Sequence, residues 1–160
     1  MAVEPFATPT NMPSLAPHIL LVEDNPDEAA LTKMALTRYA DGAPVEHVSN
    51  GQQALDYLFR RGHFSTRAGG DPTVVLLDLK MPILDGFGVL AEVKSSAALR
   101  HTPIVVLTSS TEPSDLMRAY AAGTNAYMAK PTDFGEFLGA MKHLCAFWLQ
   151  VNTPAPAALQ

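Results

Sequence analysis

Short apolar runs separated by longer helical patterns constrain this chain more than any other feature. Strong runs occupy Ile19–Val22, Val74–Leu77 and 104–107, and weaker ones occupy Val45–Val48 and Ala126–Ala129. Unbroken apolar runs of this length are typical of strands that are covered on both faces. Because helical patterns lie between them, five strands alternate with five helices. We therefore expect a parallel sheet wrapped by right-handed crossovers.

Capping residues mark the starts of the expected helices. Asn25 precedes Pro26 at the first helical position, and Glu28 stands three residues after the cap, as the acid of a capping box does. Asn50 and Gln53 repeat this arrangement. The later helices are expected over 52–61, 86–95, 113–122 and 133–149. The connection over 62–72 is long and rich in glycine, so we expect a mobile surface loop there.

Composition limits the class of protein. The 160 residues are 48% hydrophobic, enough for one domain with a buried core, which we place at 18–149 between Pro-rich tails at 1–17 and 150–160. Eleven basic residues against sixteen acidic ones give a net charge of −5, which argues against a nucleic-acid partner. A single cysteine excludes a disulfide framework, and no signal peptide or membrane-spanning run is evident. We expect a soluble, cytoplasmic protein with no membrane partner.

Polar residues follow four of the expected strands. Glu23 and Asp24 follow the first, Asp78 the third, Thr108 the fourth and Lys130 the fifth. The carboxyl ends of parallel strands form one edge of the sheet, where ligands of open α/β folds bind. Three acids at one edge repel each other and need a cation or a shared proton.

The residue types at this edge indicate phosphoryl chemistry. Oxygen ligands without a nearby His or Cys favour a hard cation such as Mg²⁺. A lysine and a hydroxyl can cradle an anionic group, so Asp78 would be the nucleophile that attacks phosphorus. An aspartate-nucleophile phosphohydrolase is an alternative, although Lys80 stands where such enzymes need a second Asp.

The strings ILLVEDNPDE, VVLLDLKMPILDGFGVL, PIVVLTSS and AGTNAYMAKP resemble the receiver domain of two-component response regulators, over about residues 19–148. The resemblance implies a flavodoxin-like three-layer α/β fold with strand order 2-1-3-4-5. It also implies that Asp78 accepts a phosphoryl group from a phosphohistidine of a sensor histidine kinase. A receiver that no longer takes phosphate and serves as a scaffold stays open as an alternative.

The resemblance also assigns a metal site. Glu23 and Asp24 would hold Mg²⁺, with Asp24 and Asp78 as direct ligands and the main-chain carbonyl of Lys80 as a third. Lys80 itself departs from the shorter polar residues common at its position, which leaves the lifetime of the phosphoryl group open.

Three further residues gain a role from the resemblance. Thr108 would hydrogen-bond to the phosphoryl group and Lys130 would pair with it. Tyr127 would be the switch aromatic that turns inward when Thr108 moves; the alternative is an aromatic that simply packs. The Lys130–Pro131 bond matches a position where the family has a cis peptide.

The string ALDYLFRRG, the long connection that follows it and the late string FWL at Phe147–Leu149 resemble response regulators that serve phytochrome-type, light-sensing kinases. About a dozen Pro/Ala-rich residues follow Leu149, so we expect output through protein contacts or onward phosphotransfer rather than enzymatic turnover.

The last helix suggests a second partner. An apolar stripe is expected to face the sheet: Phe134, Phe137, Leu138, Met141, Leu144, Cys145 and Trp148. Phe147, Leu149 and Val151 fall outside it. We hypothesise a homodimer through this helix and its extension, with the helix over 113–122 as a further contact. The alternative is a tail that folds back over these residues within one monomer.

Overall fold

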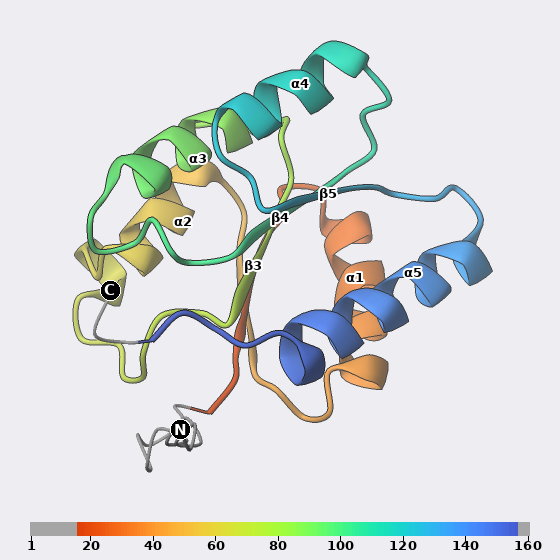
Figure 1. The fold of residues 1–160 in the computed structure, drawn as a ribbon, viewed down its shortest axis with the longest axis horizontal. Coiled ribbons are helices and arrows are strands. Elements are labelled where there is room, and N and C mark those ends of the chain that lie inside the picture. Colours follow the sequence, from red (N-terminus) through yellow and green to blue (C-terminus); the bar gives the residue numbers. More distant parts are fainter. Residues whose placement is uncertain (1–15, 157–160) are drawn as a thin grey trace, which may run out of the picture.

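The computed structural model describes residues 16–156, in which five parallel strands alternate with five α-helices (Figure 1). In chain order the elements are β1 (Ile19–Val22), α1 (Pro26–Tyr39), β2 (Val45–Val48), α2 (Gly51–Leu58), β3 (Val74–Leu77), α3 (Gly86–Ser95), β4 (Ile104–Thr108), α4 (Pro113–Ala121), β5 (Ala126–Ala129) and α5 (Phe134–Ala146). A 3-10 turn, η1 (Gly62–Phe64), follows α2, and a π-helical turn, η2 (Phe147–Val151), continues α5. Most of the predicted N-terminal tail, and residues 157–160 of the C-terminal one, lie outside the described residues.

The strands form one sheet in the order β2-β1-β3-β4-β5, and every neighbouring pair is parallel. This confirms the predicted fold and strand order. The chain order reverses at β1, which pairs with β2 on one side and β3 on the other. Val22 and Leu77, the last residues of β1 and β3, are paired at this switch point, and it is there that open α/β sheets bind ligands.

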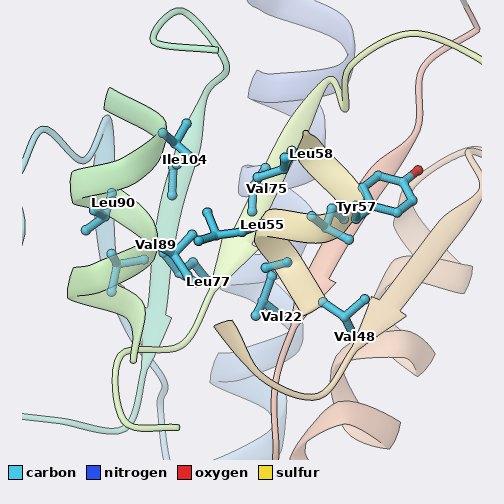
Figure 2. Close-up of a cluster of buried hydrophobic side chains, with 14 of the residues drawn as sticks. Val22, Val48, Leu55, Tyr57, Leu58, Val75, Leu77, Val89, Leu90 and Ile104 are labelled. Atoms are coloured by element: carbon cyan, nitrogen blue, oxygen red, sulfur yellow. The ribbon is translucent and has the colours of Figure 1, made fainter. Parts of the chain in front are cut away.

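Each face of the sheet carries its own hydrophobic core. Val22 and Leu77 point toward α2 and α3 and pack with Leu55 of α2 (Figure 2). Leu21 and Leu76 point to the opposite face, which α1 and α5 cover. Slipping a strand by one residue would exchange its two faces, and burying one leucine contributes about 1.5–3 kcal/mol. The cores therefore fix the register, and with it the polar residues that follow each strand.

The start of α1 matches its prediction except in one side chain. The Asn25 side-chain oxygen accepts hydrogen bonds from the main-chain N–H groups of Asp27 and Glu28. The Asn25 main-chain N–H donates to Glu23, at 3.1 Å from Oε1. In a capping box that donor would bond to Glu28. Glu23 takes this role, and the Glu28 carboxylate is free for another partner.

The second helix is shorter than expected. Asn50 caps it as predicted by accepting from the Gln53 main-chain N–H at 2.9 Å. The helix ends at Leu58 instead of Arg61. Arg60 has a left-handed backbone, with φ of 54°, and an α-helix of L-residues does not continue through that conformation.

The 62–72 connection, which the sequence predicts as a mobile surface loop, makes several hydrogen bonds in the structure. Arg67 donates from Nε to the Tyr57 carbonyl oxygen at 2.8 Å and from Nη1 to that of Gly70 at 3.0 Å. Its guanidinium lies 4.1 Å from the centroid of the Tyr57 ring, and its side chain is only 8% exposed. Arg60 donates to the carbonyl oxygens of Arg67 and Gly69. Hydrogen bonds from charged donors contribute about 1.5–3 kcal/mol each, so the two arginines fasten the connection to α2.

The last helix confirms part of the predicted stripe. Its central apolar residues are buried: Phe137, Met141, Leu144 and Cys145. Phe134 is 43% exposed, against prediction, because it begins the helix and lies over a groove beside α1. Leu149 packs against the core, also against prediction, because a π-helical turn takes an extra residue and shifts the phase of the side chains. Phe147 and Val151 remain exposed.

Cys145 is the chain's one cysteine and is 1% exposed in the core between α5 and the sheet. Burial raises the pKa of its thiol to about 11. The thiolate is the reactive form of cysteine, so the raised pKa disfavours reaction. The Cys145 side chain is part of the core, as the sequence indicated.

Candidate functional site

Sheet hydrogen bonds continue into the residues at the carboxyl ends of the strands. The Asp78 main-chain N–H donates to the Val22 carbonyl oxygen at 3.1 Å, and the Lys130 N–H donates to that of Thr108 at 2.7 Å. The sheet thus fixes the backbone of each of these residues. Asp78 and Thr108 are buried, with 7% and 1% of their surfaces exposed.

Asp78 lies at the centre of this edge, after the middle strand. Its Oδ1 accepts a hydrogen bond from the Leu79 main-chain N–H at 2.7 Å. Oδ2 accepts none from the part of the chain that the structure describes, and Asp78 lines an open pocket of about 350 Å³. One oxygen therefore orients the carboxylate, and the other keeps its lone pairs for a reacting group.

Glu23 and Lys130 form a buried ion pair beside Asp78. Lys130 Nζ lies 2.5 Å from Glu23 Oε2, and the two side chains are 9% and 2% exposed. Burial raises the pKa of Glu23 to about 7, although the hydrogen bond from Lys130 acts in the opposite direction. Burial alone would lower the pKa of Lys130, but its hydrogen bond to Glu23 and the charge of Asp78 outweigh this and raise it. Lys130 therefore stays an ammonium and holds the acids together.

Glu28 joins this group, although the sequence indicated only a capping role for it. Its Oε2 lies 3.4 Å from Lys130 Nζ. Carboxylate oxygens of Glu23, Glu28 and Asp78 all lie within 4.8 Å of one another. The first turn of α1 places Glu28 over the end of β1. The sequence signal for this position of Glu28 is the acid at Glu23, because a second carboxylate can accept the capping hydrogen bond of the Asn25 main-chain N–H.

The pocket next to Asp78 lies between the acids and the β4–α4 connection. Its lining residues are Asp24, Asn25, Glu28, Asp78, Lys80, Thr108, Ser109 and Ser110. Asp24 is exposed at this pocket, whereas Glu23 is buried. Six of the seven residues that the sequence singled out thus lie in or beside this pocket. The seventh, Tyr127, lies on β5 opposite Val106, two residues before Thr108 in the neighbouring strand.

The β4–α4 connection bears hydrogen bonds that the sequence did not indicate. The Ser110 main-chain N–H donates to Thr108 Oγ1 at 3.2 Å, and the Ser110 hydroxyl donates to Asp115 Oδ2 at 2.6 Å. Asp115 Oδ2 also lies 3.6 Å from Lys80 Nζ. Lys80 is 69% exposed, so this ion pair is weak. The Lys80 side chain thus reaches the first turn of α4.

Tyr127 points inward, against the core that faces α2 and α3. Its hydroxyl is buried and has no hydrogen-bond partner of good geometry within residues 16–156. Burial is the main cause that raises the pKa of this phenol, and the charge of Asp115 adds to it. The inward position is the one that the resemblance implies for a switched aromatic.

The Lys130–Pro131 peptide bond is trans, since residues 16–156 contain no cis peptide bond. The expectation of a cis bond there is therefore not met. The trans form is intrinsically preferred at X–Pro bonds by about 0.5–1 kcal/mol.

His47 is a further contact that the sequence did not indicate. Its Nε2 lies 2.8 Å from the main-chain oxygen of Glu23, so the imidazole donates to that carbonyl. The bond links β2 to the turn that carries the acids. His47 lies within the half-polar strand β2.

The donor set fits a hard divalent cation. Asp24 and Asp78 present carboxylates to one pocket, and the buried Glu23 stands behind them. Magnesium binds such oxygen donors through one or two carboxylates and keeps several waters. The open pocket leaves room for those waters.

A family model for the response regulator receiver domain matches residues 19–142, most of the chain. The chain belongs to the response regulator receiver family. Among curated relatives of this receiver domain is the probable methanogenesis regulatory protein FilR2 of Methanothrix harundinacea. The two are 42% identical over 142 residues, which are 87% of this chain and 88% of FilR2.

Solved structures similar to this receiver domain include three response regulators. The phosphorylated cyanobacterial phytochrome response regulator RcpA is 33% identical, with a TM-score of 0.82, and the match covers 88% of this chain and 99% of RcpA. The Mn²⁺-bound Rcp1 of Synechocystis is 29% identical, with a TM-score of 0.80 and coverage of 88% and 99%. The bacteriophytochrome response regulator AtBRR is 49% identical, with a TM-score of 0.70 and coverage of 88% and 100%.

Over residues 16–156, each helix is too short or too polar to cross a bilayer.

Proposed function

We propose that this receiver domain is a signalling protein that accepts a phosphoryl group on Asp78 from a histidine kinase. The observation that carries the proposal is the Asp78 carboxylate, held through Oδ1 and placed beside a buried lysine and a buried threonine. In the reaction an Asp78 oxygen attacks phosphorus and the P–N bond of the phosphohistidine breaks. Its electron pair returns to the imidazole nitrogen. Thr108 and Lys130 then stabilise the phosphoryl oxygens.

Asp24 and Asp78, with the main-chain carbonyl of Lys80, would hold Mg²⁺ beside the phosphoryl group, and Glu23 would support them. Bound there, the cation supplies positive charge that offsets repulsion between the acids and the incoming phosphate. The Mn²⁺-bound form of Rcp1 supports this assignment, since it shows that a related protein takes up a divalent ion.

The kinase that this proposal favours is a phytochrome-type sensor. Its support is the 49% identity with a bacteriophytochrome response regulator and the match to RcpA. A docking surface lies next to the pocket, where α1 meets the β5–α5 connection. An apolar groove there is lined by Leu31, Pro131, Phe134 and Phe137 and shares Glu28 and Lys130 with the site. Transfer from a kinase that uses ATP would take place in the cytoplasm.

The switch in this proposal consists of Thr108 and Tyr127. Phosphoryl oxygens would draw the Thr108 hydroxyl, and Tyr127 would turn inward behind it, to the position against the core that it has in this structure. Its support is the shared register of the two strands, in which Thr108 pairs with Ala129, two residues after Tyr127. Local charge would thus bias an element with two arrangements.

Phosphoryl uptake tests the proposed function. Incubated with Mg²⁺ and acetyl phosphate, the protein should gain the mass of one phosphoryl group in intact-mass spectra. Hydroxylamine should remove that group, since it cleaves acyl phosphates, and EDTA should prevent its formation. Steady release of phosphate from sugar phosphates would instead favour the hydrolase. No adduct with any donor would favour the scaffold.

We also propose a homodimer through α5 and its extension. Phe147 is 47% exposed and Val151 69% exposed, so the described part of the extension does not fold back over them. Two apolar side chains near each other at a helix end favour a second copy, because water would otherwise cover them.

Light scattering during gel filtration tests the dimer. Wild-type protein should elute with twice the mass of one chain, and Phe147→Asp with Val151→Asp should elute as a monomer. The matched control is Ile83→Asp, which charges an apolar side chain that is 80% exposed near α3. A wild-type monomer at high micromolar concentration, with and without a phosphoryl analogue, would contradict the dimer.

A further inference from the structure

Glu28 is the carboxylate of the site whose purpose the proposed function leaves open. It belongs to the first turn of α1, and Glu23 has taken over its capping role. Its side chain is 34% exposed and lies 3.4 Å from Lys130 Nζ. Glu23 already pairs with that ammonium at 2.5 Å. Lys130 therefore does not depend on Glu28 for a counter-charge.

Glu28 also lies between the pocket at Asp78 and the neighbouring apolar groove. It lines the pocket that contains Asp78, and it lines the apolar groove that Leu31 and Phe134 help to form. A phosphodonor held in that groove would reach Asp78 past the Glu28 carboxylate. The leaving group of the donor therefore departs next to a negative charge.

We infer that Glu28 is a specificity-determining residue that favours an imidazole leaving group over a carboxylate leaving group. The inference rests on the proposed function, since it concerns the donor for Asp78. Glu28 thus favours phosphoryl groups carried on histidine and disfavours the small acyl phosphates of metabolism.

The two donors differ in the charge that the leaving group carries. With N-phosphoimidazole protonated on its second nitrogen, an Asp78 oxygen bonds to phosphorus and the P–N bond breaks. The electron pair stays on nitrogen, and neutral imidazole departs. With acetyl phosphate the P–O bond breaks, the pair stays on oxygen, and acetate departs with a full negative charge. A carboxylate nearby stabilises the protonated ring and repels the acetate.

The size of the effect follows from Coulomb's law. Because the Glu28 side chain is 34% exposed, solvent weakens its interaction with a charge on the leaving group to that of a surface ion pair, which changes a rate by about fivefold. A purely structural role of Glu28, such as holding Lys130, would alter the rates with both donors alike. The ratio of the two rates therefore isolates the charge.

Initial rates of adduct formation, measured by intact-mass spectrometry at saturating Mg²⁺ and fixed ionic strength, test the inference. Glu28→Gln should lower the ratio of the N-phosphoimidazole rate to the acetyl phosphate rate by about fivefold. Glu28→Asp should keep most of the wild-type ratio. Added salt should shrink the difference between wild type and Glu28→Gln, because exposed charges are screened.

Asp27→Asn is the matched control, because it removes one negative charge from the same helical turn at an exposed residue outside the pocket. Its ratio should equal that of the wild type. An unchanged ratio in Glu28→Gln, or an equal fall in Asp27→Asn, would overturn the inference and leave Asp78 as the acceptor. A wild-type protein that takes phosphate from neither donor would overturn the proposed function as well.

Discussion

Asp78→Asn should abolish phosphoryl uptake. The amide has nearly the same shape as the carboxylate, so its oxygen can still accept from the Leu79 main-chain N–H, at the 2.7 Å of the wild type. It lacks the second anionic oxygen that attacks phosphorus. Formation of the adduct with Mg²⁺ and acetyl phosphate should therefore fall by a factor on the order of 10³ or more. Intact-mass spectra over a time course measure this loss.

Asp41→Asn is the matched control for this loss. Asp41 is exposed at the end of α1 with a left-handed backbone, φ 50°, a conformation that asparagine adopts readily. This variant should take up phosphate at the wild-type rate. An adduct of the same mass, formed by Asp78→Asn at the wild-type rate, would place the acceptor on another residue.

Gly86→Ala should destabilise the protein by about 3 kcal/mol. A Cβ at Gly86 would overlap the carbonyl oxygen of Asp78 and lie 2.8 Å from Leu79 Cα. Both are backbone atoms, which no side-chain rotation can move aside. The Gly86 main-chain N–H also donates to the Leu79 carbonyl oxygen at 2.8 Å. Urea unfolding followed by circular dichroism measures the loss, and phosphoryl uptake should fall with it because Asp78 must shift.

Gly139→Ala serves as the comparison for Gly86. Gly139 lies within α5, and a Cβ there would meet nothing within 4 Å. Alanine should stabilise that helix by about 0.5–1 kcal/mol. Should Gly86→Ala unfold at the urea concentration of the wild type, the close approach of α3 to Asp78 is wrong.

The sheet and the positions of its site residues were predictable from local patterns. Four β-branched or aliphatic residues in a row mark β1 and β3, and burial on both faces leaves little choice of register. Asp78 and Thr108 follow such runs directly, so strand pairing alone carries them to the same edge. The parallel order then follows from alternation with helices, and the resemblance supplied the order 2-1-3-4-5.

The contacts between side chains were not predictable in the same way. Lys130 and Glu23 are 107 positions apart, and no local pattern says which of two acids a lysine will choose. Glu28 does not accept the expected capping hydrogen bond, because the Asn25 main-chain N–H donates to Glu23 Oε1 instead. Arg67 is polar and precedes the glycines at 69 and 70, yet it is buried because its guanidinium packs over the face of the Tyr57 ring.

The two hydrogen bonds of Ser110 connect Thr108 to the first turn of α4. A threonine hydroxyl has one proton to donate and two lone pairs, so Thr108 can donate to a new acceptor while Ser110 still donates to it. Ser110 in turn grips Asp115, inside the first turn of α4. A shift of the Thr108 hydroxyl would thus be passed through Ser110 to Asp115 and the start of α4. Such a shift would move the outer surface of α4, where Met117 and Tyr120 are exposed and could contact a partner protein that binds one orientation of the helix.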